Sequence, residues 1–437
     1  MGARETALAA LIACRKEDAW SNGVLKEYIR RDELDRREAA LATRLCYGVL
    51  QNRILLDHYL TQLLTGKLKD LHPALRDILH LGLYQMYFMD KIPSAAAVNE
   101  SVSLAKKYCK KVSSAPGLVN GVLRSADRRR DALQQPKGYA EKYSHPQELV
   151  DLLKANVGKE KLEKMLIANN AAVETTVQVN TLRTDVDRLL QTLLNEGVQA
   201  QKHSWMENCL VLSGTGSLET LDSFRSGLYY VQDPAAKLSV MCAQILENAN
   251  VLDCCSAPGG KSFAAAMALK GTGSIISCDI HPHKVLLIQK GAQRLGIENL
   301  SAQVQDASMF VPQWEKQMDV VIADVPCSGY GIIRKKPDIR YKKPETMEQL
   351  PQLQLAILAN QARYVKNGGV LLYSTCTLLK RENEEVVQNF LKENTEFTLE
   401  PLQLPNVFPE NTTGMLTLVP GEYDTDGFFI CRLRRKL

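Results

Sequence analysis

The sequence predicts an all-α N-terminal domain, a small α/β segment, and a C-terminal α/β domain built on a parallel sheet. The chain of 437 residues is too long for one ordinary hydrophobic core. Apolar residues recur at three- and four-residue steps up to about residue 130, which is the period of helices. From about residue 235, short apolar stretches alternate with helical stretches, which is typical of a parallel sheet with helices on both faces.

The N-terminal domain is predicted over residues 1–130. The stretches "EAALATRLCYGVLQNRILLDHYLTQLL" and "HPALRDILHLGLYQMYFM" both follow the helical period, and Pro73 suits the first turn of the second one. Ser94 is a candidate N-cap for the helix that follows. Because no β-branched alternation interrupts these stretches, we expect helices only.

Residues 131–147 contain two prolines and a glycine, so we expect a linker there. A small α/β subdomain is predicted over 148–230. It has a helical stretch (147–168), a strand (175–182), a helix (185–197) and short strands near "CLVLSG" and "GLYYVQD".

Residues 231–437 form the predicted parallel-sheet domain. Its strand candidates are "NVLDCCSA", "SIISCDI", "LSAQVQD", "MDVVIADVP" and "GVLLYSTCT". Its helix candidates are "KSFAAAMALK", "HKVLLIQKGAQRLG", "PQLQLAILANQARYV" and "ENEEVVQNFLKEN".

The composition, with 45% hydrophobic and 24% charged residues, is that of a soluble globular protein. No apolar run approaches the roughly 20 residues that cross a membrane, and the N-terminus lacks the apolar core of a signal peptide. We therefore expect a cytoplasmic protein with no membrane partner. The 11 cysteines include no Cys-x-x-Cys pair, which argues against a zinc ribbon or a thioredoxin-type site, and we expect no metal.

Charge is concentrated at one end of the chain. The net charge is +5, yet residues 1–130 alone hold 22 Lys and Arg against 14 Asp and Glu. A basic N-terminal domain suits a polyanionic partner such as RNA, and a solvated helical surface is the alternative.

The stretch "DCCSAPGGKS" ends like a phosphate-binding P-loop but lacks that motif's first glycine, because Cys255 stands there. Pro258 also removes a backbone N–H that a phosphate would need. A glycine turn after the first strand of a doubly wound sheet instead suits an adenosine-type cofactor. G-x-G-x-x-G is absent, which disfavours a dinucleotide oxidoreductase.

Acidic residues end three later strands. Asp279 lies 19 residues after Gly260, the usual place for an acid that binds ribose hydroxyls. Asp306 and Asp324 follow two further strands, so the three acids should line the carboxyl edge of the sheet. The alternative is that each one caps a helix or a turn, and for Asp306 alone this alternative is favoured.

Two cysteines also follow strands at this edge. Cys327 lies in "ADVPCSGYG" and Cys376 in "YSTCTL". A lone cysteine is more often a buried small hydrophobe. Two thiols that converge beside a cofactor site instead indicate nucleophilic chemistry by a thiolate.

The motifs "DCCSAPGGK", "DVPCSGYGIIRKKPDIR" and "STCT" resemble the signature motifs of the RNA cytosine-C5 methyltransferases, the Nol1/Nop2/Sun family. The helical N-terminal domain, with "RREAALATRLCYGVLQNR", resembles the antitermination factor NusB. The resemblance covers nearly the whole chain. It implies a Rossmann-like, S-adenosylmethionine-dependent methyltransferase sheet and RNA-binding roles for the two preceding domains. The pairing implies 16S ribosomal RNA, unassembled or partly assembled, as the substrate of a monomeric enzyme.

The resemblance also implies roles for individual residues. Cys376 would attack carbon 6 of cytosine, Asp324 would hydrogen-bond N3, and Cys327 would help to release the product. If the Asp324 carboxyl group is the donor of that bond, burial must raise its pKa. The residues implied in cofactor binding are Cys255, Ser256, Ala257, Pro258, Gly259, Gly260, Lys261, Asp279, Asp306 and Asp324. The run Cys254-Cys255-Ser256 departs from the commoner family pattern. We expect Cys254 to pack in the core and Cys255 to contribute only its backbone.

A basic stretch follows the first of the two thiols. Arg334, Lys335, Lys336 and Arg340 are the candidates for phosphate contacts beside the target base, with a solvated loop as the alternative for each. Two other functions stay open from the sequence: a methyltransferase for tRNA or another rRNA site, and a non-catalytic RNA-binding or antitermination factor. The second would not need two thiols at the ligand edge.

Overall fold

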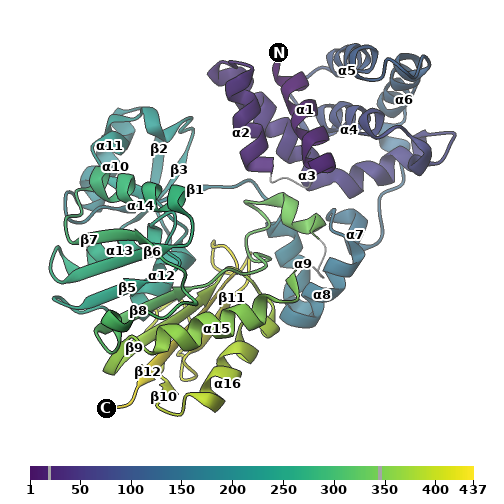
Figure 1. Cartoon of the computed structure of the whole chain (residues 1–437). Coiled ribbons are helices and arrows are strands. Elements are labelled where there is room, and N and C mark those ends of the chain that lie inside the picture. The colour runs from purple at the N-terminus through teal and green to yellow at the C-terminus, as the bar shows by residue number, and fades with distance from the viewer. Residues whose placement is uncertain (18–20, 343–346) are drawn as a thin grey trace. The chain divides into compact units, whose positions relative to one another are not determined.

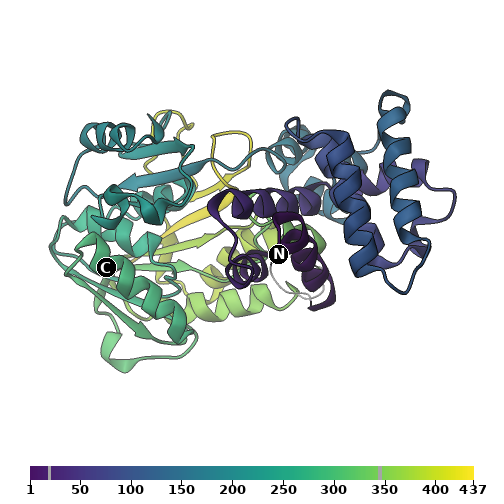
Figure 2. The same cartoon turned by 90° about the horizontal axis from the view of Figure 1, so that it is seen from above.

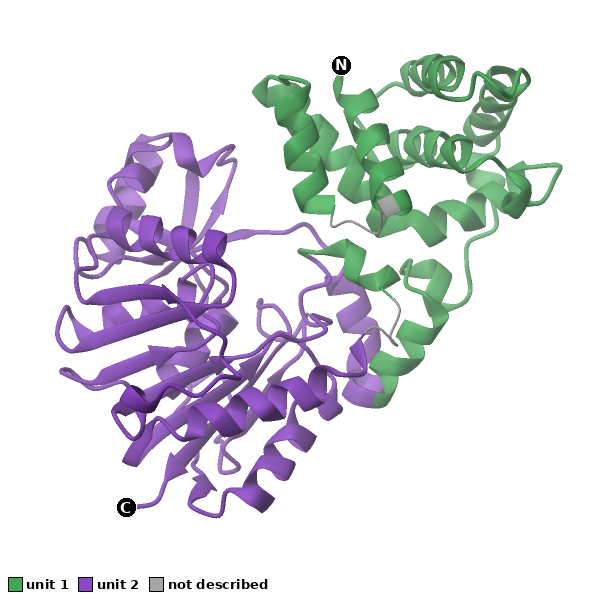
Figure 3. Ribbon diagram, in the orientation of Figure 1, with its two compact units in different colours: residues 1–155, 335–342 green, residues 156–334, 343–437 purple. Residues whose placement is uncertain are grey.

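The computed structural model describes residues 1–17, 21–342 and 347–437, which divide into two compact units (Figures 1 and 3). Unit 1 comprises Met1–Ala155 and Lys335–Lys342, and unit 2 comprises Asn156–Arg334 and Lys343–Leu437. None of the described helices is both long and apolar enough to span a bilayer.

Unit 1 is helical, as predicted. Its helices are α1 (Ala3–Glu17), α2 (Ser21–Arg31), α3 (Arg36–Leu63), α4 (Pro73–Phe88), α5 (Ser94–Tyr108), α6 (Ala115–Arg128), α7 (Tyr139–Lys142) and most of α8 (Gln147–Val157). The carboxylate of Asp35 caps α3 by accepting from the backbone N–H of Glu38 at 2.8 Å. Pro73 opens α4 as expected, whereas α5 has Pro93 and not Ser94 at its N-cap.

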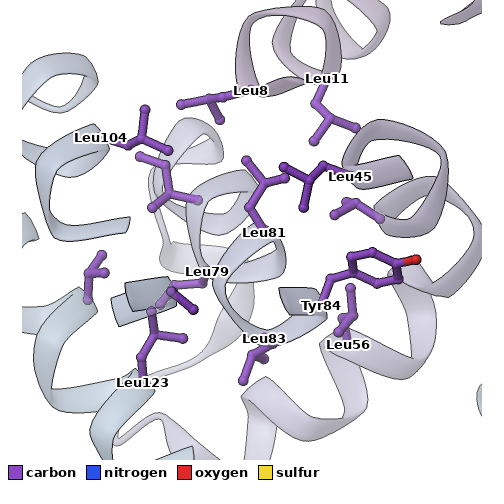
Figure 4. Close-up of a cluster of buried hydrophobic side chains, with 14 of the residues drawn as sticks. Leu8, Leu11, Leu45, Leu56, Leu79, Leu81, Leu83, Tyr84, Leu104 and Leu123 are labelled. Atoms are coloured by element: carbon purple, nitrogen blue, oxygen red, sulfur yellow. The ribbon is translucent and has the colours of Figure 1, made fainter. Parts of the chain in front are cut away.

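The core of unit 1 is built from leucines of several helices. The labelled side chains in Figure 4 include Leu8, Leu45, Leu79, Leu104 and Leu123. Gly48 lets α3 approach α4 closely, because a Cβ there would lie 1.9 Å from the Tyr84 ring. A side chain at position 48 would therefore have to displace the Tyr84 ring.

The predicted linker, residues 131–147, is held against α3. The backbone N–H of Gln134 donates to Oε1 of Gln62 at 2.8 Å, and its carbonyl lies 2.8 Å from Nε2 of His58. Leu133 joins the core of unit 1, and α7 follows. The prolines and glycine that suggested a linker interrupt the helices, but the segment remains packed.

A second segment of unit 1 comes from far along the sequence. The short 3₁₀ helix Pro337–Tyr341 belongs to unit 1, and Figure 3 shows it in that unit's colour. Arg340 is only 2% exposed, and its Nη1 donates to the carbonyls of Gln51 at 2.8 Å and Ser144 at 3.1 Å. The chain thus passes from unit 2 into unit 1 after Arg334 and returns after Lys342.

Unit 2 begins with the small α/β subdomain. Its elements are α9 (Lys159–Ala168), β1 (Thr175–Val179), α10 (Val186–Asn195), β2 (Gln199–Lys202), β3 (Cys209–Ser213), α11 (Asp222–Arg225) and β4 (Tyr229–Val231). The strands form an antiparallel sheet in the order β2-β3-β1-β4. The helix predicted over 147–168 is interrupted at Gly158, whose φ is 83°. Strand β2 was missed, because "QAQK" has no apolar alternation.

The remainder of unit 2 is the predicted α/β domain. Its elements are α12 (Pro234–Cys242), β5 (Asn250–Asp253), α13 (Gly260–Leu269), β6 (Ser274–Asp279), α14 (Pro282–Leu295), β7 (Leu300–Val304), β8 (Met318–Asp324), α15 (Leu350–Ala362), β9 (Val365–Thr375), α16 (Glu384–Glu393), β10 (Phe397–Leu399), β11 (Met415–Leu418) and β12 (Phe428–Arg435).

The described strands of this domain form a mixed eight-stranded sheet. Its order is β10-β12-β9-β8-β5-β6-β7, with β11 paired to β12. The run from β9 to β7 is parallel, as predicted. Beyond this run the sheet is mixed, because β12, yellow in Figures 1 and 2, pairs antiparallel with β9. The element before β12 ("FFICRLRR") is the strand β11 and not a helix, so the alternation of strands and helices did not predict it.

Helices cover both faces of the sheet. Side chains of α12, α13 and α14 share one core with Val251, Ile322, Leu372 and Ile430. Side chains of α15 and α16 share another with Leu252, Val321, Leu371 and Phe429. Successive residues of each strand point to opposite faces, so a strand that is buried on both faces needs consecutive apolar residues. Val251 and Leu252 of β5 and Leu371 and Leu372 of β9 are examples.

Candidate active site

The parallel strands bring the predicted acids to one edge of the sheet. Because β8, β5, β6 and β7 are consecutive in the sheet, their carboxyl ends lie in a row. This row places Asp324, the glycine loop after Asp253, Asp279 and Asp306 along one side. Such an edge is where doubly wound sheets bind their ligands.

The glycine loop turns sharply from β5 into α13. The backbone N–H of Ser256 donates to the carbonyl of Cys278 at 2.8 Å, and that of Gly259 donates to the carbonyl of Ser256 at 2.7 Å. Gly259 has a φ of 111°, where glycine is strongly favoured. The peptide bond between Ala257 and Pro258 is cis. The loop therefore ends with the N–H groups of the first turn of α13 available to a ligand.

Asp279 and Asp306 also shape local turns. Oδ1 of Asp279 accepts from the backbone N–H of His281 at 3.0 Å, and Oδ1 of Asp306 accepts from the N–H and Oγ of Ser308 at 2.9 and 2.7 Å. Within the described residues, Oδ2 of each acid has no hydrogen-bond partner. The turn-capping alternative thus holds for one oxygen of each acid, and the other oxygen can accept from a ligand hydroxyl. Together with the glycine loop, these acids fit an adenosine-type cofactor.

Asp253 is a buried acid that the sequence did not single out. Its Oδ2 accepts from Oγ of Ser262 at 2.7 Å, and Ser277 in turn donates to Ser262 at 2.8 Å. Burial raises the pKa of Asp253 to about 7, against the lowering effect of the Ser262 hydrogen bond. An acid directly before the glycine loop, at the end of an apolar strand, was the available signal for this residue.

Lys261 and Asp324 form an ion pair in the site. Nζ of Lys261 lies 2.7 Å from Oδ2 of Asp324, and Oγ of Ser374 donates to Oδ1 at 2.8 Å. Burial alone would lower the pKa of Lys261, but the charge and hydrogen bond of Asp324 outweigh it, so that the pKa is raised. Nζ of Lys261 also lies 5.0 Å from the centre of the Phe428 ring. The sequence pointed to neither Ser374 nor Phe428, which come from β9 and β12.

The two predicted thiols meet. Sγ of Cys327, in the loop after β8, lies 3.1 Å from Sγ of Cys376, which follows β9. Both side chains are half-buried. The hydrogen bond with Cys376, followed by burial, raises the pKa of Cys327 well above its ordinary value. Either sulfur can donate the hydrogen bond between them.

The loop after Cys327 packs on the loop after Cys376. The backbone N–H of Gly331 donates to the carbonyl of Cys376 at 2.9 Å, and the N–H of Gly427 donates to the carbonyl of Gly331 at 2.8 Å. Cys254 is buried in the core, as expected, and the neighbouring Cys255 is half-buried.

The predicted RNA contacts have different environments. Arg340 is buried and donates to backbone carbonyls of unit 1, so the expectation that it binds a phosphate was wrong. Nη2 of Arg334 lies 3.5 Å from Oδ1 of Asp426, so its charge is partly balanced. Lys335 is half-buried, and Lys336 is exposed. Of these four cations, Lys336 is therefore the most accessible to a phosphate.

No group of three or more metal-binding side chains occurs among the residues that the structure describes.

Comparison with protein families divides the chain in three. A model for the 16S rRNA methyltransferases RsmB/F matches residues 240–434, and a NusB family model matches residues 1–128. A model for the ferredoxin-like domain of RsmF/B-like methyltransferases matches residues 145–219. These ranges follow the helical domain, the small α/β subdomain and the large sheet.

Curated relatives match the whole chain. Probable ribosomal RNA small subunit methyltransferase B of Bacillus subtilis (strain 168) is 38% identical over 447 residues, covering 99% of this chain and 98% of the relative. Ribosomal RNA small subunit methyltransferase B of Vibrio vulnificus (strain YJ016) is 32% identical over 399 residues, covering 90% of both proteins.

Solved structures agree on the fold. The crystal structure of PH0851 superposes with a TM-score of 0.80 at 25% identity and covers 99% of both chains. NSun6 from Pyrococcus horikoshii, crystallised with the S-adenosylmethionine analogue SFG, has a TM-score of 0.59 at 20% identity and covers 66% of this chain and 98% of its own. S-adenosylmethionine is the methyl donor of the RsmB/F family. The chain belongs to the ribosomal RNA small subunit methyltransferase B family, in which an RsmB/F methyltransferase domain follows a NusB-like domain and a ferredoxin-like domain.

Proposed function

We propose that this protein methylates carbon 5 of a cytosine in 16S ribosomal RNA through a covalent bond between the Cys376 sulfur and carbon 6 of the base. The observation that carries the proposal is the pair of thiols, whose sulfurs lie 3.1 Å apart at the ligand edge of the sheet. A non-catalytic RNA-binding factor would have no use for this arrangement beside a cofactor loop.

The methyl donor would be held by the glycine loop and the acids of the edge. The first-turn N–H groups of α13, after Gly259 and Gly260, suit a carboxylate. The free Oδ2 atoms of Asp279 and Asp306 suit hydroxyl or amino donors. Bound there, S-adenosylmethionine supplies an electrophilic methyl group. Phosphate chemistry is disfavoured, because the P-loop pattern fails at Cys255.

Carbon 5 of cytosine is too weak a nucleophile to take a methyl group directly. Addition of the Cys376 thiolate to carbon 6 removes the aromaticity of the ring and places electron density on carbon 5. The adduct is stabilised when N3 receives a hydrogen bond. We assign this bond to the Lys261–Asp324 pair, because Asp324 already accepts from Lys261 and Ser374 and the protonated Lys261 is the available donor.

Product release completes the cycle. The proton on carbon 5 passes to a water molecule, its electron pair restores the double bond between carbons 5 and 6, and the Cys376 sulfur departs with the electrons of its bond to carbon 6. Cys327 can assist this departure, because its sulfur lies within hydrogen-bond distance of the Cys376 sulfur, 3.1 Å away. The contact favours this role over direct removal of the carbon 5 proton by Cys327.

The RNA substrate is proposed from the relatives' names and from charge. Relatives that match the full chain are named for small-subunit ribosomal RNA, and residues 1–130 carry an excess of basic side chains. A monomeric enzyme acting in the cytoplasm on unassembled or partly assembled 16S RNA fits the need to turn the base out of any stack. The helical domain and the ferredoxin-like domain would supply much of the RNA contact.

Two cysteine variants test the chemistry. With 16S RNA and labelled methyl donor, Cys376→Ala should abolish methyl transfer. Cys327→Ala should allow attack but stall release, which gives a covalent protein–RNA band on a denaturing gel. Cys431→Ala, a buried cysteine of β12 in the same sheet, serves as the matched control and should keep transfer. Bisulfite sequencing of the RNA would then identify the modified base.

The outcomes separate the possible roles. An adduct with the Cys376 variant and none with the Cys327 variant would exchange the two assignments. Methylation that survives both substitutions would refute the covalent mechanism. Transfer to tRNA but not to 16S RNA would refute the substrate while leaving the chemistry intact.

A further inference from the structure

Glu382 is a fully buried carboxylate that the reaction described above does not use. It is 0% exposed and ends the short 3₁₀ helix Lys380–Glu382, between β9 and α16. Its Oε2 accepts from the backbone N–H of Ser328 and from Nε2 of Gln354, both at 2.9 Å. Ser328 directly follows Cys327, so this carboxylate fixes the backbone on the C-terminal side of Cys327.

Gln354 fixes the backbone on the N-terminal side of Cys327. Its Nε2 donates to the carbonyl of Pro326 at 2.9 Å, in addition to its bond to Glu382. Gln354 lies in α15 and is also fully buried. The residues immediately before and after Cys327 are therefore both fixed by one buried pair, which leaves the backbone at Cys327 little freedom.

Glu382 is connected to the other thiol through its neighbour. Nδ2 of Asn383 donates to the carbonyl of Thr377 at 3.0 Å, and its Oδ1 accepts from Oγ1 of Thr375 at 2.6 Å. Thr375 and Thr377 flank Cys376. Oγ1 of Thr377 also lies 2.7 Å from Oγ of Ser328, which links the two loops directly. Consecutive residues thus hold the two cysteine loops, Glu382 the first and Asn383 the second.

A buried carboxylate is costly for stability unless its hydrogen bonds compensate. Here Oε1 of Glu382 has no hydrogen-bond partner among the described residues, although Oε2 has two. The two bonds to Oε2 both involve groups that hold the segment around Cys327, since Ser328 follows that residue and Gln354 also binds the Pro326 carbonyl. The charge of Glu382 also faces Cys327 and adds to the effects of Cys376 and burial that raise the pKa of that thiol.

We propose that Glu382, with Gln354, is the positioning residue that holds the Cys327 thiol against the Cys376 sulfur for product release. The inference rests on the proposed roles of the two cysteines. Glu382 does not contact the base. It acts through the Ser328 N–H and, by way of Gln354, the Pro326 carbonyl. In the release step, the bond between carbon 6 and the Cys376 sulfur breaks, the carbon 5 proton goes to water, and the Cys327 S–H group hydrogen-bonds the departing sulfur.

Two substitutions at position 382 separate the hydrogen bonds from the charge. Glu382→Gln keeps an acceptor for Ser328 and Gln354, so release should stay within about threefold of the unaltered protein. Glu382→Ala removes the acceptor, and release should slow about 100-fold, the effect of a displacement of roughly 1 Å at a reacting group. The measurement is single-turnover kinetics, with formation and decay of the covalent protein–RNA band followed separately.

The distinguishing result is that only one of the two steps changes. Adduct formation by Cys376 should stay within about threefold in Glu382→Ala, so the band should accumulate as it does with Cys327→Ala. The double variant should release no more slowly than Cys327→Ala alone, because residues that act through one group are not additive. Equal slowing of formation and release would show a general structural role and overturn the proposal, as would slow release in Glu382→Gln.

A matched pair of glutamines covers the case in which Glu382→Ala does not fold. Gln354 and Gln361 are both buried in α15, and each donates through Nε2 to a backbone carbonyl, Pro326 at 2.9 Å and Ala307 at 2.7 Å. Gln354→Leu should slow release at saturating cofactor, whereas Gln361→Leu should not. Equal effects would overturn the proposal. If Cys327→Ala accumulates the adduct but Gln354→Leu does not, this inference fails while the proposed function stands.

Discussion

Nζ of Lys261 lies 2.7 Å from Oδ2 of Asp324, which joins the first turn of α13 to the end of β8. The pair connects the glycine loop with the strand that leads to Cys327. Because the Lys261 side chain is 11% exposed and the Asp324 side chain 26% exposed, removing either partner leaves the other largely desolvated and unpaired.

The first prediction concerns this pair. Lys261→Met should lower single-turnover methyl transfer by at least about 100-fold, as the loss of one electrostatic donor commonly does. Asp324→Asn should have a similar effect, because it removes the charge that keeps Lys261 protonated.

A second ion pair that also involves β8 provides the control. Lys366 of β9 pairs with Asp319 of β8 at 3.1 Å and is partly exposed. Lys366→Met should leave transfer unchanged, because partly exposed pairs contribute little. A comparable loss in Lys366→Met would mean that the pairs stabilise the sheet and do not serve the reaction.

The second prediction concerns the buried acid Asp253. Burial raises its pKa to about 7, from an ordinary value of 3.8. The folded protein therefore holds a proton that the unfolded chain releases, and the stability due to Asp253 falls as pH rises from about 4 to about 7. Asp253→Asn keeps an acceptor for Ser262 but cannot ionise, so this pH-dependent loss of stability should disappear. The loss amounts to about 4 kcal/mol of unfolding free energy at most.

Thermal unfolding of both proteins between pH 5 and 8.5 would measure this effect. The melting temperature of Asp253→Asn, relative to that of the unaltered protein, should increase as pH rises toward 7. Above that pH the difference between the two melting temperatures should stay constant. Parallel curves across the range would show that Asp253 is ionised in the fold.

The third prediction concerns Gly331, four residues after Cys327. A Cβ at this position would lie 2.1 Å from the carbonyl oxygen of Gly427 and 2.8 Å from that of Cys376. Because backbone atoms cannot give way cheaply, Gly331→Ala should cost about 1–3 kcal/mol in unfolding free energy and displace the Cys376 loop. Methyl transfer should fall more than this loss of folded protein explains.

Denaturant unfolding and single-turnover transfer would be measured on the same preparation. Gly121→Ala in α6 is the control, since a Cβ there meets nothing within 4 Å. It should be neutral or stabilising by up to about 1 kcal/mol. Full activity in Gly331→Ala would contradict the close packing of these loops.

The fourth prediction separates Arg340 from Lys336. Lys336→Ala should reduce the salt dependence of RNA binding by about one counterion, because Lys336 is exposed. Arg340→Ala should not change that slope in protein that remains folded. It should instead increase hydrogen exchange at residues 335–342, which Arg340 secures through the carbonyls of Gln51 and Ser144.

Binding to an RNA of fixed sequence between 50 and 300 mM salt would test the first part, and exchange monitored by mass spectrometry the second. A smaller salt dependence of RNA binding in Arg340→Ala would indicate that Arg340 contacts a phosphate, contrary to what its burial suggests. Deleting the helical domain is a poorer test of RNA binding, because it also removes the Gln51 carbonyl that accepts from Arg340.

Much of the fold could be predicted because its signals are local. The helical period of residues 3–128 and the doubly apolar strands, such as "MDVVIAD", specify their own secondary structure. Strands β2 and β12 were missed for a physical reason. The first is a polar edge strand, and the second gains its place through pairing with β9, a partner more than 50 residues away.

The candidate site was predictable to a similar degree. Cys327, Cys376 and Asp324 follow recognisable strands, so their common edge could be inferred. Glu382, Gln354 and Ser374 could not, because each matters through a hydrogen bond to a residue distant in sequence. The phosphate contact predicted for Arg340 was wrong, because nothing in a run of basic and polar residues indicates that one of them is buried.

The sequence by itself determined the three-part organisation, the family and the thiol pair, because periodicity and motif spacing are properties of neighbouring residues. Only the tertiary structure decided the mixed sheet, the Lys261–Asp324 pair, the buried Glu382 and the capture of Arg340 by unit 1. Each of these features depends on contacts between residues that are distant in sequence. A polar group that is buried on folding needs a hydrogen-bond or charge partner, and only the tertiary structure shows which residue provides it.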